Sequence, residues 1–71
     1  MKLKLSVIGC GRLGKTLAFL LAKTGLVCVQ EVVNLNRASA EEAVAFIGQG
    51  RTCASIKQLK SADVYLIATP D

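Results

Sequence analysis

The chain has 71 residues, of which 52% are hydrophobic and 20% are charged, and this apolar surplus is typical of a sequence that packs a core and excludes a disordered tail. Its net charge is +4, but the nine lysines and arginines are dispersed singly, so we expect an anionic phosphate ligand rather than a nucleic acid. The sequence has neither a signal-peptide core nor a membrane span, and its three cysteines, without CxxC spacing or a histidine, exclude a zinc site and favour a reduced, cytoplasmic setting.

The first half of the chain predicts a strand, a helix and a second strand. Residues 4–8 form a short apolar run followed at once by glycines, which is typical of a buried strand that feeds a tight turn. Leucines recur at helical spacing from Leu13 and predict an amphipathic helix, after which Gly25 stands where a C-terminal cap would. Residues 27–35 are rich in valine and predict the second strand, with its core between Glu31 and Leu35.

The second half predicts two shorter helices and two further strands. Residues 39–42 have the spacing of a capping box, so we expect a helix that begins at Ser39 and continues to Ile47. Residues 51–54 predict a short edge strand, and residues 55–58 repeat the capping-box pattern ahead of a helix of one or two turns. Residues 63–68 predict a second clearly buried strand.

This order of elements, with connections too long for hairpins, predicts an α/β fold. We expect parallel strands joined by right-handed crossovers in the sheet order 3-2-1-4. In such a sheet the chain reverses direction between the first and fourth strands, and ligands bind at that point, outside the carboxyl ends of the strands. The turns at Gly9 and Ala68 should therefore meet at a ligand site. Because a chain of this length buries only about 60% of its unfolded surface, we also expect a missing segment, a dimer partner or a ligand to complete it.

The glycine-rich turn after the first strand carries the main functional signal. It reads Gly9-Cys10-Gly11-Arg12-Leu13-Gly14 and fits GxGxxG. In that motif the first glycine permits a tight turn, the second lets the backbone approach a pyrophosphate, and the third allows the helix to pack closely on the strand. The amides at the start of the following helix attract the anion. Since the motif lies between a strand and an amphipathic helix, it favours a dinucleotide site over a glycine turn kept for packing alone.

Asn36-Arg37 follows the second predicted strand, where an NAD-binding domain normally places a carboxylate for the adenine ribose. A guanidinium there can pair with the 2′-phosphate of NADP and stack on adenine. We therefore predict that NADP is favoured over NAD, which stays possible. The alternative is that Asn36 adopts a turn conformation and Arg37 is solvated.

The remaining candidates are weaker. Cys10 occupies a variable position of the turn, and nothing near it in the sequence except the helix terminus would lower its pKa, so we expect a cofactor contact and not a catalytic thiol. Ala68, Thr69 and Pro70 end the fourth strand, where they either touch the ribose or nicotinamide end of the cofactor or simply terminate the strand. We predict no catalytic residue and no metal ligand in these 71 residues.

With these residues placed, VIGCGRLGKTLAFLLAKTG and the later NR and IATPD resemble the N-terminal NAD(P)-binding Rossmann domain of the 6-phosphogluconate dehydrogenase-like superfamily. The pattern is nearest to pyrroline-5-carboxylate reductase and to uncharacterised two-domain Rossmann-like oxidoreductases. The resemblance implies NADP binding through seven residues: Gly9, Gly11, Arg12, Leu13, Gly14, Asn36 and Arg37. It also implies that residues 1–71 are the N-terminal part of such a domain. A C-terminal domain, absent here, would then supply substrate contacts and dimerisation.

Three functions remain open from the sequence. The first is the cofactor-binding segment of an NADP-dependent oxidoreductase, which positions a nicotinamide while another domain holds a small-molecule substrate, and which has no turnover alone. The second is a regulatory NAD-sensing domain like those of potassium transport systems, although these carry an acidic residue where Asn36-Arg37 stands. The third is an orphan half-domain used for assembly into a homo-oligomer through the edge of the fourth strand.

Overall fold

The computed structural model describes residues 2–9, 11–34 and 36–68. Four strands, two α-helices and one turn of 3₁₀ helix follow one another in the order β1 (Leu3–Ile8), α1 (Arg12–Lys23), β2 (Val27–Val33), α2 (Arg37–Ile47), β3 (Arg51–Thr52), η1 (Ile56–Gln58) and β4 (Val64–Ile67). Within this described part, neither α-helix is both long and apolar enough to cross a membrane.

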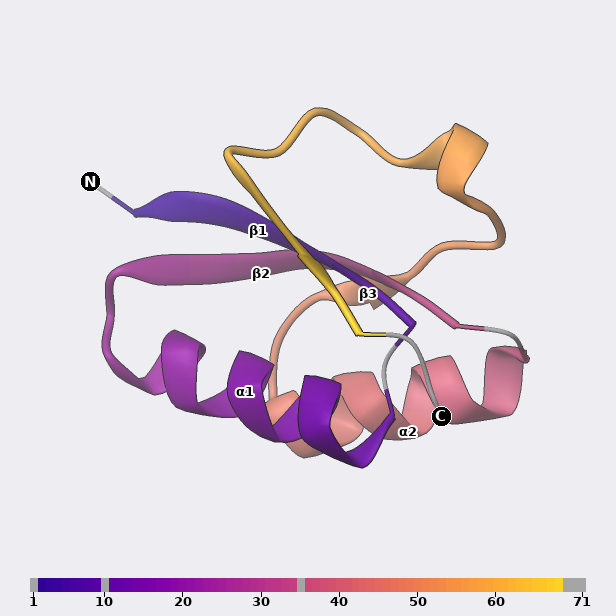
Figure 1. Ribbon diagram of the computed structural model, residues 1–71, viewed down its shortest axis with the longest axis horizontal. Coiled ribbons are helices and arrows are strands. Elements are labelled where there is room, and N and C mark those ends of the chain that lie inside the picture. The colour runs from indigo at the N-terminus through magenta and orange to yellow at the C-terminus, as the bar shows by residue number, and fades with distance from the viewer. Residues whose placement is uncertain (1, 10, 35, 69–71) are drawn as a thin grey trace.

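The strands form one parallel sheet in the order β3-β2-β1-β4, which confirms the predicted fold class. Figure 1 shows α1 and α2 together below the sheet and the β3–β4 connection with η1 passing above it. The core lies between the sheet and the two helices, where aliphatic side chains of the central strands pack on small residues of α1 and α2. Its fully or nearly fully buried members include Leu5, Val7, Val29, Val32, Ala18, Ala43 and Ile47.

The pairing of β1 with β2 contains a β-bulge. Leu5 pairs with Val29 but the next residue, Ser6, pairs with Glu31, so β2 contains one extra residue at this point. A bulge of this kind lets the apolar partners stay on the helix side while the next pair points away from it. Ser6 and Glu31, both buried, are thereby placed on the face beneath the β3–β4 connection.

The predicted strands differ from those observed at β3, which ends at Thr52 and not at Ala54, and at β2 and β4. β2 ends at Val33, before the predicted end at Leu35, which lies outside the described residues. The prediction that β4 is a buried strand is wrong, because Tyr65 and Ile67 are 48% and 66% exposed. The apolar composition of residues 63–68 is that of a buried strand, but exposure depends on what covers the strand. Within the described residues β4 is the last strand of the sheet.

The start of α2 also differs from the capping-box prediction. The N-cap is Asn36 and not Ser39, and its side-chain oxygen accepts a hydrogen bond of 2.7 Å from the Ser39 backbone N–H. Ser39 is therefore the third residue of the helix, so its hydroxyl is not the cap. The helix stop was predicted correctly, since Gly48 caps α2 in the left-handed conformation with φ 85°.

This cap assignment predicts a difference between two alanine variants. Asn36→Ala removes the acceptor for an amide at the start of α2 and should lower the free energy of unfolding by about 1 kcal/mol. Ser39→Ala leaves that hydrogen bond in place and should cost much less. Urea denaturation followed by circular dichroism measures both, and an equal or larger loss for Ser39→Ala would contradict the assignment.

Candidate functional site

The carboxyl ends of three strands meet around the glycine turn. The Gly9 N–H donates to the carbonyl of Val33 at the end of β2, over 2.8 Å, and the Ala68 N–H donates to the carbonyl of Ile8 over 2.9 Å. The turn after β1 therefore lies between the ends of β2 and β4. The expected meeting of the turns at Gly9 and Ala68 is confirmed.

The three glycines of the turn occupy three different environments. Gly9 has a positive φ of 75°, a conformation that is strained for residues with a side chain. Gly11 is exposed, and a Cβ placed on it would meet no atom within 4 Å. Gly14 is buried in α1. These environments correspond to the tight turn, the open backbone and the close helix packing that the motif predicts.

The start of α1 provides unpaired amides beside the exposed Gly11. Gly11 is the N-cap, no side chain caps the helix, and its first turn contains no acidic residue. The first amides of a 12-residue helix therefore point outward with a partial positive charge. Arg12 and Leu13 in this turn are both exposed. Cys10 was also predicted to contact the cofactor, but it lies outside the described residues.

Two cationic side chains stand near these amides. Arg12 and Lys15 line a cavity of about 110 Å³ together with Gly11, Ser39 and Glu42, so the cavity spans the starts of α1 and α2. The Lys15 ammonium lies 5.1 Å from the centre of the Phe46 ring, a cation–π contact that holds it toward α2. The local field at the turn is thus positive, with Glu42 as the opposing charge.

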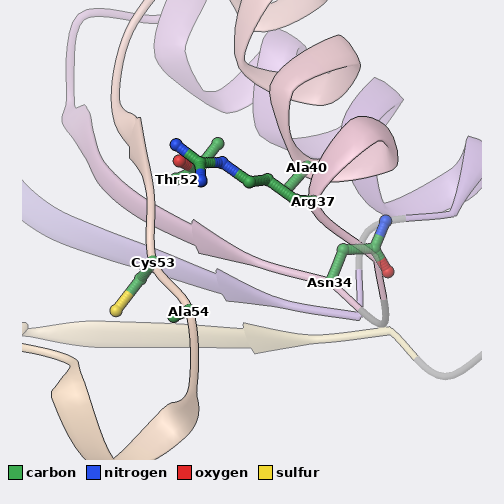
Figure 2. Close-up of a pocket in the computed structure, with 6 residues that line it drawn as sticks. All are labelled: Asn34, Arg37, Ala40, Thr52, Cys53 and Ala54. Atoms are coloured by element: carbon green, nitrogen blue, oxygen red, sulfur yellow. The ribbon is translucent and has the colours of Figure 1, made fainter.

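A larger cavity, of about 340 Å³, lies beside the end of β2. Its walls come from Asn34 after β2, from Arg37 and Ala40 of α2, and from Thr52, Cys53 and Ala54 at the end of β3. In Figure 2 the Arg37 side chain extends from α2 toward Thr52. Arg37 is 85% exposed in its side chain, and its Nε lies 3.1 Å from Oε1 of Glu41. The cavity therefore has one cationic wall and otherwise small side chains.

The structure distributes the predicted residues unequally around these cavities. The glycine turn and Arg37 lie at the carboxyl edge as expected, whereas the side-chain oxygen of Asn36 is used to cap α2. Cofactor contact by Asn36 therefore stays a prediction. The alternative, a local structural role for Asn36, is supported by the hydrogen bond from Ser39. Thr69 and Pro70 lie outside the described residues.

Sequence reasoning missed several residues that line the cavities. The predicted strands over residues 27–35 and 51–54 include Asn34 and residues 52–54, which the structure places in the wall of the larger cavity. Lys15 and Ser39 were assigned only to helices. Their position in the sequence could have indicated that they line a ligand site. They lie directly after strands or in the first turns of helices, and these segments face the carboxyl edge of the sheet in this topology. In the described ranges no group of three or more histidine, cysteine or acidic residues is arranged to hold a metal ion.

The chain was compared with known families and structures. No protein-family model matches the sequence, and no curated protein matches it significantly. Among solved structures it is similar to the crystal structure of a protein from Bacteroides fragilis described as a "putative NADP oxidoreductase", with a TM-score of 0.85 and 21% identity. The match covers 99% of this chain and 27% of that one. At this identity the likeness shows the fold, a Rossmann-type α/β sheet, and the 71 residues span about a quarter of that protein's length.

Proposed function

We propose that the chain binds a nicotinamide dinucleotide, with NADP favoured over NAD, as the cofactor-binding segment of an oxidoreductase. One observation carries the proposal: the open backbone at Gly11 stands at a helix start without a side-chain cap, directly after the turn that lies between the carboxyl ends of β2 and β4. The B. fragilis structure, whose description names NADP, has the same fold over nearly the whole of this chain. The segment would bind and orient the cofactor, while a separate domain holds the substrate.

The pyrophosphate would lie against the amides of Arg12 and Leu13, beside Gly11, whose own N–H donates to the Gly9 carbonyl over 3.1 Å. No atom lies within 4 Å of the position that a Cβ of Gly11 would occupy, so phosphates can approach the backbone closely from that side. The charge of the anion is met by the α1 terminus and by Arg12 and Lys15 at the adjoining cavity. These two cations would strengthen binding of NAD and NADP alike, because both nucleotides contain the pyrophosphate.

The adenosine half would occupy the larger cavity. Its volume of about 340 Å³ is in the range of small-molecule sites. The guanidinium of Arg37 is the cationic group of its wall, and a guanidinium matches both the charge and the forked geometry of a 2′-phosphate. The residue directly after β2 is Asn34, so the carboxylate typical of NAD-binding domains is not found at that position.

The nicotinamide half would extend past Ala68 at the end of β4. When bound, this cofactor supplies or accepts a hydride. The residues of this chain contribute binding and orientation: the turn holds the phosphates, and the strand ends set the direction of the nicotinamide. The substrate would reach the nicotinamide from a domain outside these 71 residues.

Replacing Arg37 with alanine tests the nucleotide preference. Loss of a charge-assisted hydrogen bond should weaken NADP binding by about 1 to 3 kcal/mol and barely change NAD binding. Calorimetric titration of both nucleotides against the wild type and the variant measures the difference. Lys57→Ala removes one positive charge from exposed η1 and serves as the control for net charge. Equal losses for both nucleotides, or a wild type that prefers NAD, would contradict the assignment.

A second candidate function, assembly with another chain, is favoured by the edge of the sheet. β4 is the outer strand of the described sheet, and Val64, Tyr65 and Ile67 are 38%, 48% and 66% exposed. An exposed apolar edge strand is a template for pairing with another strand. Light scattering coupled to size-exclusion chromatography distinguishes a monomer from such an assembly, and the result does not depend on nucleotide binding.

A further inference from the structure

Arg37, the cationic residue in the wall of the larger cavity, already forms an ion pair with a glutamate of the same helix. Arg37 and Glu41 are one helical turn apart, and the Arg37 Nε donates to Oε1 of Glu41 over 3.1 Å. The two side chains are 85% and 59% exposed. Arg37 also lines the cavity, so the same guanidinium faces a ligand space and an internal carboxylate.

The geometry of this pair leaves Arg37 able to bind a second anion. A guanidinium has five N–H donors, one on Nε and four on the two Nη atoms. The contact with Glu41 is made through Nε. A phosphate in the cavity can therefore use the Nη atoms, but it has to share the positive charge with the carboxylate.

We propose that Glu41 is a specificity-determining residue, which weakens NADP binding relative to NAD binding by competing with the 2′-phosphate for Arg37. The inference rests on the proposed function and concerns the same site. A 2′-phosphate carries between one and two negative charges near neutral pH, and it has to share the positive charge of Arg37 with the Glu41 carboxylate. A 2′-hydroxyl is neutral and can donate a hydrogen bond to it. The Glu41 carboxylate thus weakens the binding of NADP but not the binding of NAD.

The other charges near α2 act elsewhere. Glu42, the next residue, lines the smaller cavity with Arg12 and Lys15, beside the proposed pyrophosphate site that both nucleotides share. Arg51 on β3 lies 3.8 Å from the buried carboxylate of Glu31, which holds its charge toward the other face of the sheet. The two glutamates of α2 therefore make a matched pair, one beside the 2′-phosphate and one beside the pyrophosphate.

The test compares Glu41→Gln with Glu42→Gln in the 71-residue chain. Glutamine keeps the size and the helix propensity of glutamate, so both variants should fold. Titrations use NADP and NAD, and also 2′,5′-ADP and 5′-AMP, which isolate the 2′-phosphate. Glu41→Gln should bind NADP and 2′,5′-ADP roughly two- to fivefold more tightly, the scale of one exposed ion pair, with no gain for NAD or 5′-AMP. Glu42→Gln should change NADP and NAD by the same factor.

A double variant shows whether the effect passes through Arg37. In the Arg37→Ala background Glu41→Gln should give no gain in NADP affinity, because the competition has been removed. A gain that persists there, or a Glu41→Gln variant whose preference between the nucleotides is unchanged or lower, would overturn the inference and leave the proposed function standing. A wild-type chain that binds none of the four nucleotides contradicts the proposed function, and this inference with it.

Discussion

Replacing Gly11 with valine is expected to reduce the affinity for NADP and NAD by roughly a hundredfold while the chain stays folded. The loss corresponds to charge-assisted hydrogen bonds of about 1.5 to 3 kcal/mol between backbone amides and the pyrophosphate. Gly11 has φ −81°, which valine adopts without strain. A Cβ at this position meets nothing within 4 Å, so the new side chain would fill only the space that the phosphates need.

Calorimetry gives the affinities and circular dichroism gives the fold of this variant. Thr16→Val introduces the same side chain at an exposed position of α1, one turn further along, and should leave both affinities unchanged. A folded Gly11→Val chain that binds either nucleotide as tightly as the wild type would place the pyrophosphate away from the turn. It would leave the glycines with a packing role alone.

A Glu31→Ala variant is expected to lose about 1.5 to 3 kcal/mol of unfolding free energy, the range for a hydrogen bond to a charged group. Glu31 is 3% exposed, and its Oε1 accepts from the Lys60 backbone N–H over 2.9 Å. Arg51 lies 3.8 Å from Oε2. The carboxylate thus ties the β3–β4 connection to the centre of the sheet. In a domain whose total stability is roughly 4 to 10 kcal/mol, this loss is a large share.

Two further variants show how much of the loss in unfolding free energy comes from the hydrogen bond and how much from any substitution by alanine. Glu31→Gln keeps an oxygen that can accept from Lys60 and should lose about half as much as Glu31→Ala. Glu42→Ala, at an exposed position of α2, should stay within about 0.5 kcal/mol of the wild type. Urea denaturation measures all three variants, and limited proteolysis reports on residues 53–63. If Glu31→Ala were as stable as Glu42→Ala, the carboxylate would have no such role.

The strand order and the glycine turn could be predicted from the sequence because both depend on local patterns. The spacing of Gly9, Gly11 and Gly14 is that of the strand–turn–helix unit of a dinucleotide-binding sheet, in which each glycine has its own role. The parallel order follows from the length of the connections. Both signals are carried by residues close together in the chain, so no knowledge of long-range packing was needed.

The remaining features depend on contacts that a single sequence does not display. Asn36 and Ser39 are both good N-cap residues, and nothing in the sequence marks Asn36 as the one that caps α2. Glu31 interrupts a run of valines, but its partner amide at Lys60 is 29 residues away. The sequence predicted Arg37 as either a phosphate ligand or a solvated side chain, whereas the structure pairs it with Glu41 over 3.1 Å.

The position of β1 in the middle of the sheet has a consequence for synthesis. One edge of β1 pairs with β2, but the other waits for β4, and the link is closed by Asp63, whose N–H and carboxylate bond to the backbone of Lys4. On the ribosome that edge of β1 therefore stays unpaired until residues 63–67 have been synthesised, and until then it is open to other nascent chains. The two helices can pack on β1 and β2 earlier, but they cover a face and leave that edge bare. The four-stranded sheet is thus completed by a contact between residues that lie 59 positions apart in the sequence.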